Sequence, residues 1–249
     1  MTDIDAIRNQ GEEEIAAILA SLDERHKVIL RDALRRYGSV ENIPLEVWGK
    51  IQEDTEEEAA TVLLLLMLSG AGYTAAEIES QGGRTKRPDL ARMSLLAARQ
   101  ASNAASTAGV SLQKRITREL EQARLDQTLG DIGDLTQEGI DKALEKALDE
   151  ARRKALATDQ TTEALTTGQR EAAGGAGTTN AAGQRVTVEM RWQTERDNRV
   201  CPRCGPLHET PEEVWSKVFY DGPGVSAHPN CRCWLRAVVV VEEPKPEDA

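Results

Sequence analysis

The sequence Cys201-Pro-Arg-Cys204-Gly-Pro-Leu-His208, followed further on by His228-Pro-Asn-Cys231-Arg-Cys233, decides the fold. Together the two clusters contain all four cysteines of the chain and two of its three histidines. A CxxC turn brings two thiolates into the same space, as a tetrahedral ion with metal–sulfur bonds of ~2.3 Å requires. The second cluster supplies three more donors. The pattern therefore predicts a metal site with the ligands Cys201, Cys204, His228, Cys231 and Cys233.

Alternatives exist for parts of this site. Two disulfides are the first, but the opening Met1-Thr-Asp-Ile-Asp is acidic and lacks an apolar secretory segment, and a reducing cytosol favours zinc over disulfides. Cys231 or Cys233 could instead be a buried core thiol, because both continue into an alternating apolar pattern. His208 is either a weaker sixth ligand or an ordinary turn histidine. We favour structural zinc.

The flanks of the two clusters predict a pair of strands. Alternate residues from Val186 to Trp192 are apolar, which is the pattern of a strand with one buried face. A second alternating run extends from about Cys231 to Val241. If the strands pair antiparallel, both half-sites meet at one end of the sheet, and an ion there closes the base of the long loop between them. The entropic cost of closing a loop grows with its length, so such an ion contributes to stability. This favours a closed structural site, with the loop aromatics expected to fold back on the sheet: Trp215, Phe219 and Tyr220.

One family shares these residues. The pattern Trp192-x-Thr194-x-x-Asp197-x-x-Val200-Cys201-Pro-x-Cys204, with His228-Pro-Asn-Cys231-Arg-Cys233, resembles the phage Mu F-like family of minor head (head morphogenesis) proteins. The resemblance begins near Ala155, and family members usually carry a glycine around position 209, where this chain has Glu209. It implies a low-copy protein of the virion, made in the host cytoplasm and incorporated during capsid assembly at the portal vertex or head interior. The implied partners are the portal protein, the major capsid protein, or both.

The rest of the chain predicts helices, so the expected fold class is mainly α, with a small α+β C-terminal domain. Leu, Ile and Ala recur at helical spacing. We expect helices ending by Gly38, running from Pro44 to near Gly70, opening briefly at Thr74, running from Pro88 to about Ala108, spanning Leu112 to Leu125, and running from Asp134 to Ala155. The expected organisation is a helical N-terminal region (1–133), long connecting helices (134–173), a zinc-stapled α+β domain (174–241) and a disordered tail (242–249).

The apolar run Val62–Leu68 is far shorter than the ~20 residues that span a bilayer, so we expect a buried helix and no membrane segment. The net charge of −11 makes the chain a poor candidate for tight nonspecific binding of duplex DNA. A zinc-ribbon adaptor that contacts packaged DNA weakly is the first alternative function. Ordinary surface charge and ion pairing also explain the two basic groups that would make its contacts. The first group is Arg84, Lys86, Arg87 and Arg92, and the second is Arg185, Arg191, Arg196, Arg199 and Arg203.

A zinc-dependent hydrolase is the second alternative. Asp197, His208, Glu209 and His228 are the residues that could serve such a site. Catalytic zinc normally has three protein ligands and an open position, whereas a thiolate-rich set closes the coordination sphere. The sequence contains no HExxH, GxSxG, P-loop or Rossmann glycine motif. We therefore predict that the chain is not an enzyme.

Overall fold

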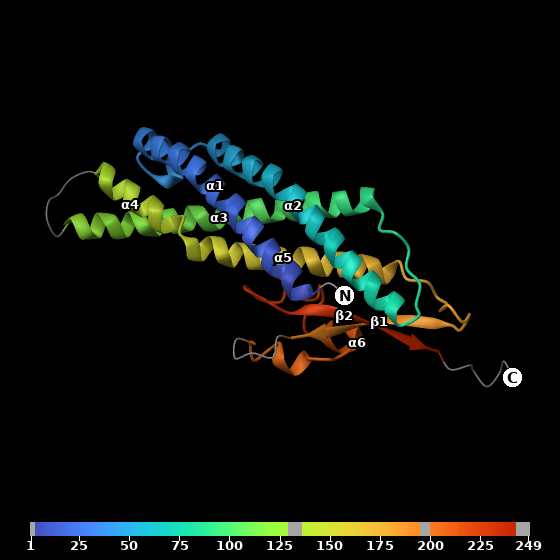
Figure 1. Ribbon diagram of the computed structural model, residues 1–249. Coiled ribbons are helices and arrows are strands. Elements are labelled where there is room, and N and C mark those ends of the chain that lie inside the picture. Colours follow the sequence, from blue (N-terminus) through green and yellow to red (C-terminus); the bar gives the residue numbers. More distant parts are fainter. Residues whose placement is uncertain (1–2, 129–135, 195–199, 243–249) are drawn as a thin grey trace.

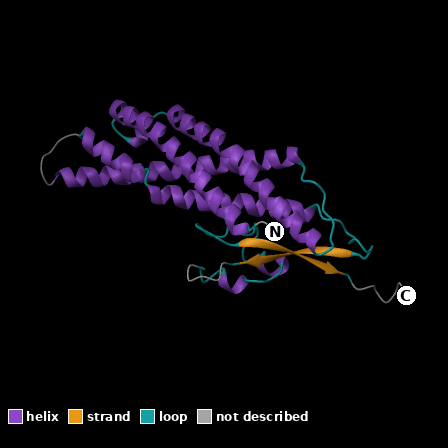
Figure 2. Cartoon of the chain, viewed as in Figure 1, coloured by secondary structure: helices purple, strands orange, loops and turns teal. Residues whose placement is uncertain are grey.

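The computed structural model describes residues 3–128, 136–194 and 200–242. Long helices run side by side, and a two-stranded antiparallel sheet packs beneath one end of this helical layer (Figures 1 and 2). The expected fold class, mainly α with a small antiparallel sheet near the C-terminus, is confirmed. The domain limits stay a prediction, and residues 243–249 of the expected tail lie outside the described part of the chain.

Three long helices form the first half of the chain: α1 (Ile4–Tyr37), α2 (Leu45–Ser80) and α3 (Leu90–Thr128). A 3-10 turn, η1 (Val40–Asn42), joins the first two. The side chain of Asp3 caps the start of α1 by accepting the amide of Asp5. Gly38 ends α1 as predicted: it has a left-handed φ of 78°, and its N–H bonds to the carbonyl of Leu34.

Both α2 and α3 are single helices where the sequence predicts two. The expected end near Gly70 is wrong, because this glycine lies inside α2 against the backbone of α5 (Glu150–Gly174). A Cβ added at Gly70 would stand 2.4 Å from the carbonyl oxygen of Leu165. The glycine therefore permits a close helix crossing and does not end the helix. The break expected near Ala108 is also absent, since α3 continues through this position to Thr128.

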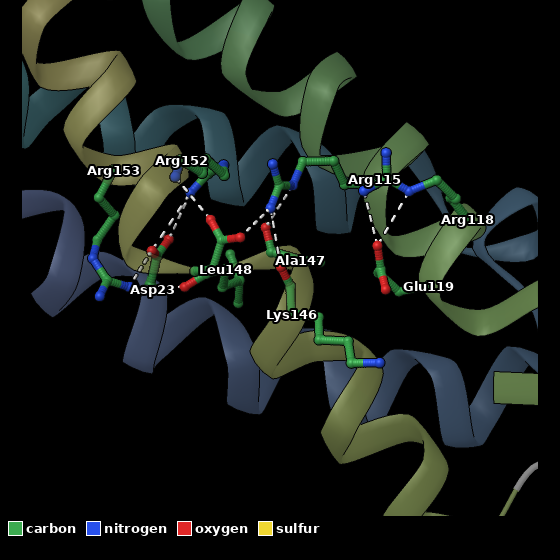
Figure 3. Close-up of polar contacts among 10 residues, drawn as sticks. Asp23, Arg115, Arg118, Glu119, Lys146, Ala147, Leu148, Arg152 and Arg153 are labelled. Atoms are coloured by element: carbon green, nitrogen blue, oxygen red, sulfur yellow. Dashed lines mark hydrogen bonds and ion pairs between the residues drawn. The ribbon is translucent and has the colours of Figure 1, made fainter. Parts of the chain in front are cut away.

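The helix expected from Asp134 to Ala155 is in fact two helices, α4 (Gln137–Ala147) and α5, with Asp134 itself outside the described residues. Figure 3 shows the contacts at the break. Arg115 of α3 donates to the backbone carbonyls of Lys146 and Ala147 at the end of α4 and to the carboxylate of Asp149. Asp149 in turn accepts the Arg152 amide at 2.8 Å and caps α5.

Beside this break, a buried ion pair joins α5 to α1 (Figure 3). The carboxylate of Asp23 lies 3.1 Å from the guanidinium of Arg152 and 3.3 Å from that of Arg153. Burial raises the pKa of Asp23, and the two arginines oppose that rise. Because Asp23 and Arg152 are both buried, each compensates a charge that would be costly alone.

The α2 helix packs against α1, α3 and α5 and carries the apolar run of the sequence. By length and composition, it is the one helix in the described ranges that could cross a membrane. A helix at the centre of a bundle has the same composition. Here Leu63, Leu66 and Met67 are buried within the core that α2 shares with α1, α3 and α5.

The sheet consists of β1 (Val186–Gln193) and β2 (Trp234–Val241), which pair antiparallel with Trp192 opposite Leu235. A 3-10 turn, η2 (Gly205–Leu207), and a short helix, α6 (Glu212–Trp215), lie in the segment between them. Trp215 and Phe219 are buried against Trp192, with ring centroids 6.0 and 5.5 Å away. Tyr220 is 79% exposed, so the expectation that it folds back on the sheet is wrong.

Candidate metal centre

The five predicted ligands come together at one end of the sheet. Cys201 and Cys204 follow β1, whereas His228, Cys231 and Cys233 precede β2. They form two groups, Cys201–Cys204–His228 and Cys204–Cys231–Cys233, and within each group the donor atoms lie within 4.8 Å of one another. Cys204 belongs to both groups. The antiparallel pairing thus brings the two half-sites together as the sequence predicts, and the cluster could hold a metal ion.

The imidazole of His228 faces the CxxC pair. Its Nε2 lies 3.2 Å from the sulfur of Cys201 and 3.0 Å from that of Cys204. The other ring nitrogen, Nδ1, lies 2.9 Å from the backbone carbonyl oxygen of Pro229. Because a carbonyl only accepts, this hydrogen bond places the proton on Nδ1 and leaves the Nε2 lone pair directed at the sulfurs. A metal-binding histidine is commonly oriented in this way.

Three of the sulfurs are shielded from solvent, since Cys204, Cys231 and Cys233 are all buried. All four cysteines are free thiols, so disulfides do not hold this site. Hydrogen bonds from the thiols of Cys204 and Cys233 hold the pKa of Cys231 well below its usual range. The pKa of Cys204 is raised, mainly because its thiol donates to Cys231. A divalent cation beside these buried sulfurs would stabilise their thiolate forms, so the donor set fits such a metal.

Local backbone geometry presents these donors. In the CxxC turn, the amide of Cys204 lies 3.3 Å from the sulfur of Cys201, and the amide of Gly205 bonds to the carbonyl of Cys201 at 3.0 Å. In the second half-site, Asn230 adopts a left-handed φ of 59°, a conformation that asparagine tolerates better than most residues.

Three packed aromatic rings, those of Trp192, Trp215 and Phe219, form an aromatic wall on one side of the cluster. Phe219 lies edge-on to the His228 imidazole, with ring centroids 6.4 Å apart, and stacks on Trp192. The Trp215 indole N–H donates to the backbone carbonyl of Met190 at 2.9 Å, which anchors the wall to β1. Apolar surroundings exclude water from the sulfurs and so strengthen their electrostatic interaction with an ion.

His208 belongs to neither group of donors. Its Nδ1 accepts the backbone N–H of Thr194 at 3.1 Å. Glu209 is turned toward Arg236, with 3.2 Å between carboxylate and guanidinium. Asp197, which the hydrolase alternative also names, lies outside the described residues. Among the described residues, His228 is therefore the one histidine of the cluster.

Three arginines of the second basic group, and Arg92 of the first, contact other residues of the chain, Arg92 through an ion pair with Glu171. Arg185 pairs with Glu242 and Arg191 with Glu189, at 3.5 and 2.9 Å. Arg203 lies over the ring of Phe219, 4.8 Å from its centroid. Two further arginines of the second group, at positions 196 and 199, lie outside the described part of the chain.

Residues far away in the sequence also contact the cluster, and the sequence motifs do not point to them. Arg8 of α1, together with Asp159 and Thr162 of α5, hydrogen bonds to the backbone of residues 230–232. All three side chains are buried. A polar residue in an otherwise apolar helical stripe is the one sequence signal they give, and that signal does not name a partner.

No protein-family model, curated protein or solved structure matches this chain. The fold and the site define a mainly helical protein whose small C-terminal sheet carries a Cys/His cluster that could hold a metal ion.

Proposed function

We propose that this chain is a minor head protein of a tailed phage and that its Cys/His cluster holds a structural zinc ion. The observation that carries the proposal is the convergence of Cys201-Pro-x-Cys204 and His228-Pro-Asn-Cys231-Arg-Cys233 at one end of a β-hairpin-like sheet. This is the motif through which the sequence resembles the phage Mu F-like family.

The donor set supports zinc over other metals. Zinc is bound in structural sites by four thiolate and imidazole ligands, whereas calcium and magnesium prefer oxygen. Here four sulfurs and one imidazole nitrogen are available, so a four-coordinate ion leaves one donor outside its coordination sphere. Cys204 is common to both groups and is the ligand we place at the centre of the set.

A structural role follows from where the ion would lie. It would tie the end of β1 to the start of β2 and so hold the intervening segment, which contains α6 and the buried rings of Trp215 and Phe219. This support matters because the hydrophobic core of so small a sheet is limited. Two residues of the hydrolase alternative have other partners, Glu209 with Arg236 and His208 with Thr194, which further favours a structural centre.

In this proposal the protein acts through protein–protein contacts during head assembly, on the portal protein, the major capsid protein, or both. The long helices supply extended surfaces for docking, and the metal-held sheet supplies a rigid end. The acidic net charge of −11 and the internal ion pairs of Arg185 and Arg191 favour protein partners over DNA.

Quantitative mass spectrometry of purified immature and mature phage particles tests the head-protein proposal. We expect the chain at a fixed low ratio to the portal protein across gradient fractions. An abundant host protein measured in the same fractions is the control, because a contaminant does not follow the portal. Absence from both kinds of particle, with the protein free in the lysate, would contradict the proposal.

A further inference from the structure

The outer edge of β2 is covered by side chains from the helices rather than by a third strand. Gln169 of α5 bonds to both backbone groups of Leu235, donating to the carbonyl at 2.6 Å and accepting the amide at 3.2 Å. Glu77 of α2 accepts the amide of Ala237 at 3.0 Å. Gln81 donates to the carbonyl of Ala237 and accepts the amide of Val239, both at 2.9 Å. A strand edge that would otherwise need a partner is therefore satisfied by the helical body.

The same arrangement continues from β2 into the second half of the metal centre. The Thr162 hydroxyl donates to the backbone carbonyl of Cys231 at 2.7 Å. The guanidinium of Arg8 donates to the carbonyl of Arg232 at 2.9 Å and lies over the ring of Trp234. The carboxylate of Asp159 accepts the backbone amide of Asn230.

These hydrogen bonds are made to backbone groups of the segment that carries the ligands, and none of them is made to a sulfur or an imidazole nitrogen. They hold three consecutive residues, one of which is Asn230 in its left-handed conformation. A loop of this length would otherwise sample many conformations, and ordering it would reduce the free energy gained on metal binding. Buried hydrogen bonds that fix it in advance remove that cost.

We propose that Asp159, Thr162 and Arg8 are positioning residues of the metal centre, so that the helical body sets the metal affinity together with the Cys and His donors. This inference rests on the proposed metal site and adds to it. It implies that the centre is not an independent zinc module, since half of its backbone is held by α1 and α5.

The size of the effect follows from comparable groups in other metal sites. Removing an outer partner that orients a ligand typically weakens metal binding by about 10- to 100-fold. Thr162→Val keeps the shape of the side chain and removes the hydroxyl, which leaves the buried Cys231 carbonyl without that donor. Asp159→Ala removes the acceptor of the Asn230 amide, whereas Asp159→Asn keeps an oxygen at that place.

The experiment measures zinc affinity of the full chain by competition with a chromophoric chelator, using Zn²⁺ alone as the probe. We expect Thr162→Val and Asp159→Ala to bind zinc at least about 10-fold more weakly than the unmodified chain. Thr162→Ser and Asp159→Asn, which retain the hydroxyl and the acceptor oxygen, should recover most of the affinity. Arg8→Met should weaken binding while preserving the packing on Trp234.

The matched control is Leu112→Ala, which opens a cavity in the separate core cluster of α1, α2, α3 and α4. It should lower stability and leave the zinc affinity unchanged at a temperature where the protein is folded. Affinities of Thr162→Val and Asp159→Ala equal to that of the unmodified chain would overturn this inference while leaving the metal site standing. An unmodified chain that binds no zinc would overturn the metal site and, with it, this inference.

Discussion

Gly168 of α5 lies directly against the backbone of Met67 in α2, so that a Cβ added to the glycine would stand 1.9 Å from the Met67 carbonyl oxygen. No real contact is that short, so any side chain here must force the two helices apart. The neighbouring contact of Gly70 with the Leu165 carbonyl is of the same kind. The two helices thus cross with their backbones touching.

Gly168→Ala should therefore destabilise the protein by about 3 kcal/mol or more, because backbone atoms cannot move aside as a flexible side chain can. Urea denaturation provides the measurement, with the slope checked for constancy. Gly72→Ala is the control, since an added Cβ there meets nothing within 4 Å. That variant should gain about 0.5–1 kcal/mol from helix propensity. Equal effects of the two substitutions would contradict the close crossing.

Glu209 has a left-handed φ of 61°, at the position where members of the resembling family usually carry glycine. Holding a non-glycine residue there costs about 1–2 kcal/mol. Glu209→Gly relieves this cost but loses the partly exposed pair with Arg236, which is worth at most about 1 kcal/mol. We expect a net gain in stability of roughly 0.5–1 kcal/mol in thermal unfolding. Glu209→Ala loses the pair without relieving the strain and should show no gain; a gain equal to that of glycine would show that strain is not the cause.

His26 should make stability depend on pH. Burial lowers its pKa to about 4, despite the nearby Asp54 carboxylate. Between pH ~6.5 and ~4 the unfolded chain binds a proton at this residue and the folded chain does not, so acidification lowers the free energy of unfolding by at most about 3 kcal/mol. His26→Leu should flatten this part of the profile. Asp23 and Glu77, whose pKa values burial raises, titrate in both proteins and cancel in the difference. Parallel profiles would contradict the prediction.

Cys204 should be the most sensitive ligand, because it belongs to both donor groups. Cys204→Ser should lose most of its bound zinc, and with it the stabilisation that zinc gives the folded state, about 4 kcal/mol at a thousandfold excess over Kd. Metal content by atomic spectroscopy and melting curves with and without chelator are the measurements. His208→Ala and Glu209→Gln, which change residues outside both groups, should keep their metal. Cys201 is a predicted ligand as well. If Cys204→Ser and Cys201→Ser both leave the metal content and the melting curve unchanged, the zinc assignment is wrong.

Removing the Asp23 side chain should lower the free energy of unfolding by more than the loss of an exposed ion pair would. Asp23→Ala leaves the buried guanidinium of Arg152 without its 3.1 Å partner and should cost about 3–5 kcal/mol. Replacing both residues by apolar side chains, as Asp23→Leu with Arg152→Met, should cost distinctly less, because no charge stays buried alone. The double-variant cycle in chemical denaturation measures the coupling. Additive losses would contradict a buried pair.

The Cys/His cluster was largely predictable because its donors lie in short local motifs. CxxC and HxxCxC each fix a half-site, and the two alternating runs place them at the same end of an antiparallel sheet. The start of the second strand was predicted at Cys231, whereas β2 begins at Trp234. The difference arises because the left-handed Asn230 and the helix contacts to residues 230–232 hold this stretch out of the ladder.

The helix boundaries were less predictable, since a glycine can either end a helix or lie inside one where another backbone packs closely against it. Gly38 ends α1 with positive φ, whereas Gly70 sits inside α2 because another backbone touches it. Nothing local distinguishes the two cases. Likewise, the division between α4 and α5 depends on Arg115 of another helix as well as on the Asp149 cap. Contacts between distant segments decided each of these outcomes, and a single sequence does not contain them.

The bond from Arg8 to the carbonyl of Arg232 joins positions 224 residues apart. During synthesis α1 is made before this partner, and the bond cannot form until the segment between the two residues has also been made. In the arrangement proposed here, the ligand loop is fully held only when α1, α5 and the C-terminal segment have come together. Tight metal binding would then be the last step of folding. A chain that binds metal tightly would be one in which these distant segments have already folded together.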